Sequence, residues 1–112
     1  MNYDKYSTHL NLLTKAALTL KKGNTIVELG AGTTSTPVLQ ASSHAKGLQF
    51  HSYEPNVQYV KTLESSVPGL THVRNWDRVV YPDKIDLLFV DHAPASRRLK
   101  DIEILRDRSK MI

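Results

Sequence analysis

A short run of acidic, glycine and hydroxyl residues has the types and spacing of a ligand-binding turn. Residues 26–37 read IVELGAGTTSTP, in which Glu28 lies in an apolar run that is followed by Gly30 and Gly32. Glycines permit positive φ angles and the close approach of a ligand to the backbone. Thr36 suits a helix N-cap and Pro37 the first helical position. We therefore expect a helix N-terminus, with its free N–H groups, to point at the ligand.

The class of ligand follows from Glu28 and from the third glycine position. Dinucleotide-binding turns have the pattern G-x-G-x-x-G, whose third glycine packs the helix against the strand. Ser35 occupies that position here, and the carboxylate of Glu28 disfavours a pyrophosphate and favours a cationic ligand. S-adenosylmethionine carries both an ammonium and a sulfonium group. A dinucleotide site and a glycine turn without a ligand are the alternatives.

Further acids follow two later apolar runs. Glu54 and Pro55 come about 20 residues after the glycine turn, where an acid is placed to accept hydrogen bonds from both ribose hydroxyls. Asp91 and His92 end another run, and ligands of open α/β sheets bind beyond the carboxyl ends of strands. His92 is a candidate general base near neutral pH. The alternatives are a helix-start carboxylate at Glu54, a turn-capping Asp91 and a solvated His92.

The elements that position these residues alternate along the chain. Strand-like patterns predict strands at 25–29, 48–53, 70–74 and 85–90, of which 85–90 is a nearly continuous apolar run, and residues 110–112 read as the opening of another. Helical spacing predicts helices over 7–22, 36–44, 56–63 and 96–106. The predicted helix N-caps are Ser7 or Thr8, Thr36, Asn56 and Ser96, and the predicted terminating glycines are Gly23 and Gly47.

This order predicts an α/β domain with a Rossmann-like, doubly wound and mainly parallel sheet. We expect the strand order 3-2-1-4, with a fifth strand absent or only begun, in three α/β/α layers. The strand at 85–90 would then have an unpaired hydrophobic edge, which invites pairing with another chain. We therefore predict either a truncated domain or a protein that self-associates through this edge. The alternative is that residues 110–112 are a frayed tail.

The motif VELGAG at 27–32 resembles the first motif of class I S-adenosylmethionine-dependent methyltransferases. STHLNLL at 7–13 and GAGTTSTPVLQ at 30–40 resemble a small subgroup of that superfamily, in which a polar Ser-Thr-Pro turn follows the glycines. The resemblance covers most of the chain and makes residues 1–112 a single cofactor-binding domain, the N-terminal portion of the full fold. The cofactor-binding residues that follow are Glu28, Gly30, Ala31, Gly32, Ser35, Thr36, Glu54, Pro55, Asn75, Trp76, Asp77 and Asp91.

The resemblance also implies individual roles. Glu54 binds the ribose, Asn75 or Asp77 meets the adenine amino group, and Trp76 covers the adenine face. A core position is the alternative for this lone tryptophan. The segment at Asp91 positions the substrate, and some O-methyltransferases bind a divalent cation there. One carboxylate and one histidine do not make a metal site, so we predict none.

Composition narrows the class of protein. The chain has 112 residues, 40% of them hydrophobic and 23% charged, as expected of one globular domain. It has no apolar run of the roughly 18 residues that a membrane span needs, no visible secretory signal and no cysteine, so we expect a cytoplasmic location. The net charge of +4 favours a mildly basic surface over a nucleic-acid partner. Arg97 and Arg98, predicted in a first helical turn, mark either an anion or subunit contact or a solvated surface.

The leading functional hypothesis is an S-adenosylmethionine-dependent methyltransferase. It would transfer the methyl group to an oxygen or nitrogen nucleophile of a small molecule, with Asp91 and His92 as the catalytic residues. Such transfer depends mainly on positioning. The alternative is a non-catalytic S-adenosylmethionine-binding or oligomeric assembly module derived from a truncated methyltransferase. The sequence does not identify the methyl acceptor.

Overall fold

The computed structural model describes residues 5–32 and 34–112, with side chains from Leu12 onward. The helices and strands, in chain order, are α1 (Lys5–Leu18), β1 (Thr25–Leu29), α2 (Ser35–Lys46), β2 (Gln49–Glu54), α3 (Val57–Leu63), β3 (Leu70–His72), β4 (Ile85–Val90), α4 (Arg98–Leu105) and β5 (Ser109–Met111). Short 3₁₀ helices are η1 (Trp76–Arg78), η2 (Ala95–Arg97) and η3 (Arg106–Arg108). Across the described ranges, none of the helices has the length and apolar character needed to cross a membrane.

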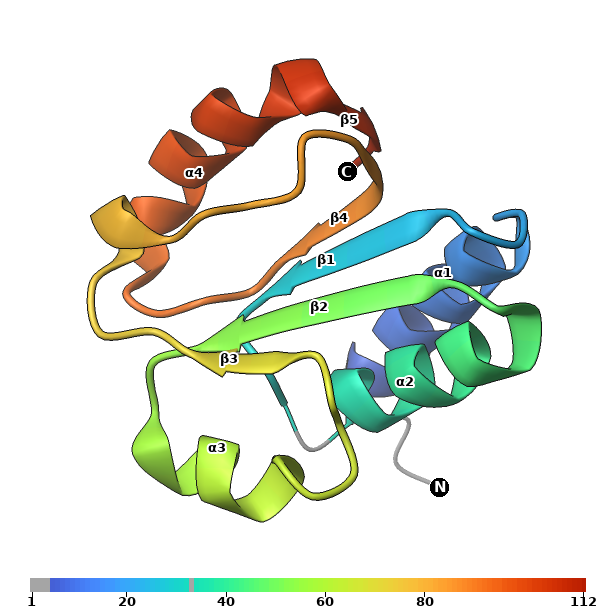
Figure 1. Ribbon diagram of the computed structural model, residues 1–112, viewed down its shortest axis with the longest axis horizontal. Coiled ribbons are helices and arrows are strands. Elements are labelled where there is room, and N and C mark those ends of the chain that lie inside the picture. The colour runs from blue at the N-terminus through green and yellow to red at the C-terminus, as the bar shows by residue number, and fades with distance from the viewer. Residues whose placement is uncertain (1–4, 33) are drawn as a thin grey trace.

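The strands form one parallel sheet with the order β3-β2-β1-β4-β5 (Figure 1). This confirms the predicted α/β class and parallel sheet. The predicted four-strand order is incomplete, because β5 pairs with β4 through Ile85↔Ser109 and Leu87↔Met111. The prediction of an unpaired edge is therefore wrong for the first half of β4, and the frayed-tail alternative is wrong for residues 110 and 111, which lie in β5.

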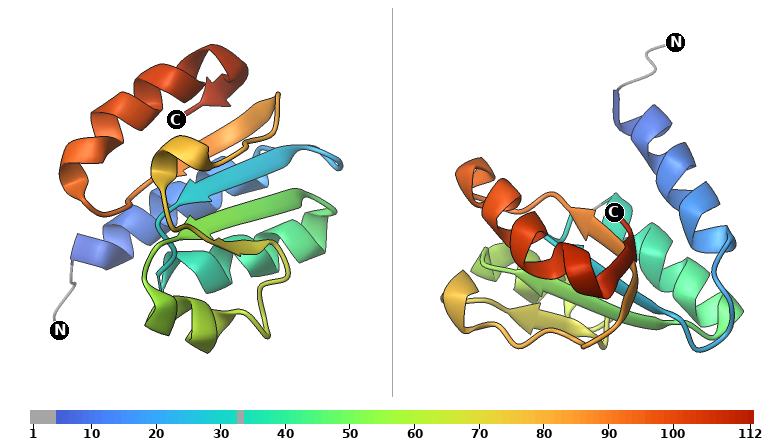
Figure 2. Two further views of the ribbon diagram at one scale, coloured as in Figure 1. Left: turned by 60° about the vertical axis from the view of Figure 1, so that its left-hand side comes forward. Right: turned by 90° about the horizontal axis from the view of Figure 1, so that it is seen from above.

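Buried apolar side chains form two clusters that use alternate residues of β1. Ile26 belongs to a cluster with side chains of α1, α2 and α3. Val27 and Leu29 belong to another, with Leu105 of α4 and Trp76 of η1. Because successive strand residues point to opposite faces, each face of the sheet has its own core. Figures 1 and 2 show α4 lying apart from the pair formed by α1 and α2.

The helix ends test the predicted caps. Asn56 is confirmed as an N-cap, since its side chain accepts hydrogen bonds from the N–H groups of residues 58 and 59. Thr36 and Ser96 are not N-caps: Thr36 lies inside α2, and Ser96 lies in η2. The prediction of Ser7 or Thr8 as a cap is also wrong, because both lie within α1. The first helix ends at residue 18 rather than 22, so Gly23 lies beyond it in a turn.

The connection from β3 to β4 contains no α-helix. Residues 73–84 cross the sheet with η1 as their helical element (Figure 1). Val73, Trp76, Val79 and Tyr81 from this connection pack with Tyr53 of β2 in the second core cluster. This part of the sheet is therefore covered by loop side chains rather than by a helix.

We expect Gly47→Ala to destabilise the protein by about 1 kcal/mol. Gly47 ends α2 with φ at +67°, in the left-handed region, and its N–H donates to the carbonyl of Ser43. A Cβ atom there would also lie 3.1 Å from Cγ of Lys22. Urea denaturation measures the effect. Gly32→Ala, at a glycine without a positive φ and with room for a Cβ atom, is the control and should not show this loss; equal stability of Gly47→Ala and the wild type would contradict the strain.

Candidate functional site

The carboxyl ends of β1, β2 and β4 meet at one edge of the sheet. The N–H of Gly30 donates to the carbonyl of Tyr53 at 2.8 Å, and the N–H of Asp91 donates to the carbonyl of Leu29 at 2.7 Å. These main-chain bonds join the glycine turn to both neighbouring strand ends. The structure thereby brings together the predicted site residues Glu28, Gly30, Ala31, Gly32, Ser35, Thr36, Glu54, Pro55 and Asp91.

Gly30 is required by both its conformation and its surroundings. Its φ is +93°, and a Cβ atom would lie 2.5 Å from the carbonyl oxygen of Asp91. Gly32 has neither constraint: its φ is outside the positive region, and a Cβ atom would meet only Oγ of Ser35, at 3.5 Å. The first glycine therefore serves the packing of the β4 end against the turn, whereas the second leaves the backbone open.

Glu28 is the centre of a buried hydrogen-bond network. The hydroxyls of Thr36 and Ser52 donate to Oε1 at 2.6 and 2.7 Å, and the hydroxyl of Ser35 donates to Oε2 at 2.8 Å. Thr36 also accepts a hydrogen bond from the N–H of Gly32 at 2.8 Å. The network therefore links β1, β2, α2 and the glycine turn.

The Glu28 side chain does not face a ligand. It is 0% exposed, and both oxygens are occupied by hydroxyl groups of the chain. Burial raises its pKa, the three hydroxyl bonds oppose that rise, and the nearby Asp91 carboxylate adds to it. The Glu28 carboxylate is therefore not accessible for the predicted direct attraction to a cationic ligand. Glu28 positions the turn instead, and Ser35 and Thr36 are committed to it.

Glu54 lies where the sequence places the ribose-binding acid. One carboxylate oxygen accepts a hydrogen bond from the N–H of Asn56 at 2.6 Å, and the carboxylate also accepts from the N–H of Ala31 in the glycine turn. Burial raises the pKa of Glu54, while these N–H groups and His72 lower it in part. A carboxylate has about four lone-pair sites, so two of them are not used by these N–H groups, although the side chain is only 6% exposed.

The predicted adenine-binding residues lie in different environments: one is buried in the core and two are exposed. Trp76 is a buried core residue whose indole N–H donates to the carbonyl of Ala93 at 3.1 Å. The amide oxygen of Asn75 accepts from the N–H of Asp77 and caps η1. Asp77 is exposed and pairs with Arg97 at 2.8 Å. The core alternative therefore describes Trp76, and Asn75 and Asp77 remain exposed at the end of β3.

His92 and Asp91 are neighbours in sequence but occupy opposite environments. His92 is 0% exposed: its Nε2 lies 2.6 Å from Oδ2 of Asp101, and its ring packs edge-on against Trp76. Since a carboxylate accepts, Nε2 carries the proton, and the buried Nδ1 has no partner. Protonation would leave Nδ1–H unpaired in the core, and burial lowers the pKa of His92 accordingly. His92 is therefore not a solvated residue, and its ring contacts Asp101 and Trp76 in the core.

The arginines that follow β4 are held by acids of the same chain. Arg97 donates to both oxygens of Asp101 and to Asp77. Arg98 donates to the carbonyl of His92 at 2.9 Å and pairs with Asp91 at 3.3 Å. These contacts oppose the unfavourable position of two cations at the start of α4. In this structure both arginines therefore bind groups of the same chain, in place of the predicted anion and of solvent alone.

Two residues that complete these networks were absent from the sequence prediction. Ser52 stands directly opposite Glu28 in the β1–β2 register, but β2 reads QFHSYE, so this serine does not stand out among the other polar residues of the strand. Asp101 follows Arg97 by four residues, the spacing of helical ion pairs. Burial alone would raise the pKa of Asp101. The hydrogen bonds from Arg97 and His92 outweigh burial, and the pKa of Asp101 is lowered.

Comparison with known proteins gives no relative. No family model matches the chain, and neither a curated protein nor a solved structure matches it. Within residues 5–32 and 34–112, no three His, Cys, Asp or Glu side chains group in a way that could hold a metal ion.

We expect Glu28→Leu to destabilise the protein by about 2–5 kcal/mol, and Glu28→Gln by about 1 kcal/mol or less. Leucine leaves the buried hydroxyls of Thr36 and Ser52 without an acceptor, whereas glutamine keeps one oxygen for them. Urea denaturation at pH 7 measures both variants. Equal stability of the two variants would show that the hydroxyls do not depend on an acceptor at this position.

We expect acid to destabilise the wild type more than His92→Gln. The pKa of His92 is lower in the folded chain than in the unfolded chain, so the unfolded chain binds more protons as the pH falls through the ordinary histidine range. The free energy of unfolding of the wild type, minus that of the variant, should fall from pH 7.5 to 5.5, by at most about 1.4 kcal/mol per pH unit. Denaturation at several pH values measures this difference. A difference that does not change with pH would contradict a neutral, buried His92.

Proposed function

We propose that this chain is a methyltransferase-like domain that binds S-adenosylmethionine at the carboxyl edge of its sheet. We also propose that the domain has a Rossmann-like, three-layer α/β/α architecture, with α1, α2 and α3 on one face of the sheet and α4 on the other. The two core clusters, one on each face of the sheet, support it.

The observation that carries the proposal is the position of the Glu54 carboxylate. It lies at the end of β2, bound to the N–H of Ala31 in the glycine turn. A carboxylate with free lone pairs, fixed beside a turn of bare backbone, suits the adjacent hydroxyls of a ribose. Its second anchor, the N–H of Asn56, holds its orientation before a ligand arrives.

The remaining residues fit an adenosyl ligand in part. The backbone at Gly32, where a Cβ atom would meet little, is open to the ligand, and Asn75 lies exposed beyond β3. Asp91 is 58% exposed at the end of β4 and would lie near the ligand's cationic groups. The cofactor, when bound, would supply the methyl group, and the chain would supply orientation and exclusion of water.

A second candidate is binding without methyl transfer. The burial of His92, the predicted general base, and the pairing of Asp91 with Arg98 favour this reading. The His92 ring is buried and bonded to Asp101, so it does not meet an acceptor at the strand ends in this structure. In the transferring version, the chain would act on a small molecule whose oxygen or nitrogen is already nucleophilic. Self-association through the outer sheet edge, now formed by β5, stays part of the proposal.

Thermal denaturation with added ligand tests the proposal. S-adenosylmethionine or S-adenosylhomocysteine at 100 times its dissociation constant should stabilise the protein by about 2.7 kcal/mol. Glu54→Ala should weaken binding about tenfold, because it removes charge-assisted bonds to the ribose. Each variant is compared with its own ligand-free form, which separates binding from stability.

Glu103→Ala, which removes an exposed acid of α4, is the matched control and should bind as the wild type does. Stabilisation by NAD but not by S-adenosylmethionine would replace the proposal with the dinucleotide reading. Unchanged affinity in Glu54→Ala would remove the ribose assignment. Product formation with an acceptor, against binding alone, separates the two candidate functions.

A further inference from the structure

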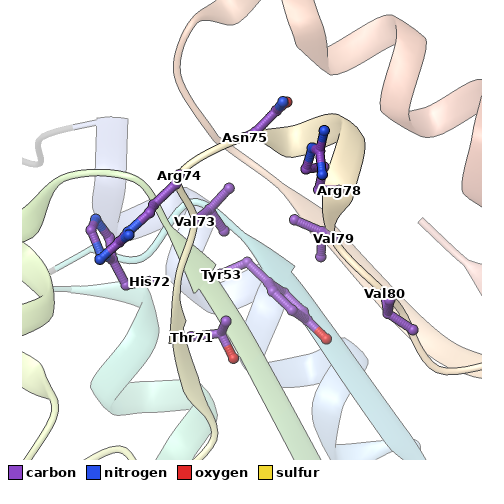
Figure 3. A pocket seen from close by; sticks show the side chains of 9 residues that line it. All are labelled: Tyr53, Thr71, His72, Val73, Arg74, Asn75, Arg78, Val79 and Val80. Atoms are coloured by element: carbon purple, nitrogen blue, oxygen red, sulfur yellow. The ribbon is translucent and has the colours of Figure 1, made fainter.

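A hollow of about 380 Å³ lies beside β3, outside the glycine turn (Figure 3). It is bounded by side chains of β2 and β3 and by the connection that contains η1. Its volume falls within the range of about 300–1,000 Å³ that small-molecule sites occupy. It exists because loop side chains, rather than a helix, cover this part of the sheet.

The inside of the hollow is largely apolar. Figure 3 shows the Tyr53 ring at its centre, with Val73 on one side and Val79 and Val80 on the other. Tyr53 is held in place by its edge-on contact with Tyr81, at a centroid distance of 5.1 Å. An aromatic ring flanked by valines suits a flat apolar group.

The rim of the hollow is cationic, with no acid among the residues that line it. Arg74 and Arg78 both line the hollow, and His72 lies beside Arg74 (Figure 3). Within the described chain, neither arginine has a side-chain hydrogen bond or an ion pair. The four remaining arginines each make one, to an acid or a carbonyl group: Arg97, Arg98, Arg106 and Arg108.

We propose that this hollow binds a small organic oxyanion, with its apolar body beside Tyr53 and the valines and its carboxylate or phosphate group at the cationic rim, to which Arg74 and Arg78 contribute from different sides (Figure 3). A guanidinium group matches either oxyanion through paired N–H donors. The absence of lining acids leaves the positive potential of the two arginines uncompensated. The hollow shares Asn75 with the proposed cofactor site, and the variants that test it leave Asn75 unchanged.

Titration of the full chain with benzoate and with phenyl phosphate, followed by amide NMR shifts, tests the site. We expect saturable shifts centred on residues 71–80, and no saturation with benzyl alcohol, which has the ring without the charge. The double variant Arg74→Gln/Arg78→Gln, which removes both rim charges, should weaken binding about tenfold. Arg106→Gln removes one such charge from an exposed position outside the hollow and should leave affinity unchanged.

A second pair of variants uses Val80, which is 88% exposed and can be changed without loss of the fold. Val80→Asp places an acid in the hollow and should abolish oxyanion binding, whereas the isosteric Val80→Asn should retain it. Equal loss in Arg106→Gln, equal binding of benzyl alcohol, or unchanged binding in Val80→Asp would each overturn the proposal. The relative affinity of benzoate and phenyl phosphate identifies the preferred oxyanion. Because S-adenosylmethionine is absent from this titration, its result does not depend on the cofactor proposal.

Discussion

A buried carboxylate holds the centre of this structure together. Glu28 stands in the central strand, without exposure to solvent, and its cost of burial is offset by hydroxyl donors from α2 and β2. One of those hydroxyls, on Thr36, also receives the N–H of Gly32. The angle at which α2 leaves the glycine turn, and the place of β2 beside β1, are thus set by the same acid.

This arrangement separates side chains that build the edge of the sheet from groups that can meet a ligand. The hydroxyls after the glycines serve Glu28, and His92 with Asp101 anchors the end of β4 to α4. What remains at this edge is mainly backbone, the exposed Asp91 and the anchored carboxylate of Glu54, which is itself only 6% exposed. Such an edge is better equipped to orient a bound molecule than to move its protons.

Elements with a continuous apolar run could be predicted from sequence, and polar partners distant in sequence could not. The bounds of β1 and β4 match the predicted ranges, because each is a central strand buried on both faces. Thr36 has the residue type of an N-cap, but a carboxylate on the neighbouring strand competes for its hydroxyl. His92 looks like a solvated base because its partner lies nine residues further on, in a helix. In both cases the deciding contact crosses between elements.

The position of β1 in the sheet has a consequence for how the chain acquires its structure. Its two neighbouring strands are synthesised at different times. β2 follows β1 after one helix, whereas β4 comes much later: the hydrogen bond from Thr25 to Asp86 joins residues 61 positions apart. During synthesis from the N-terminus, one side of β1 therefore stays without its ladder partner until β4 has been made. For that interval the growing chain carries an unpaired hydrophobic strand edge, the feature through which strands pair with other chains.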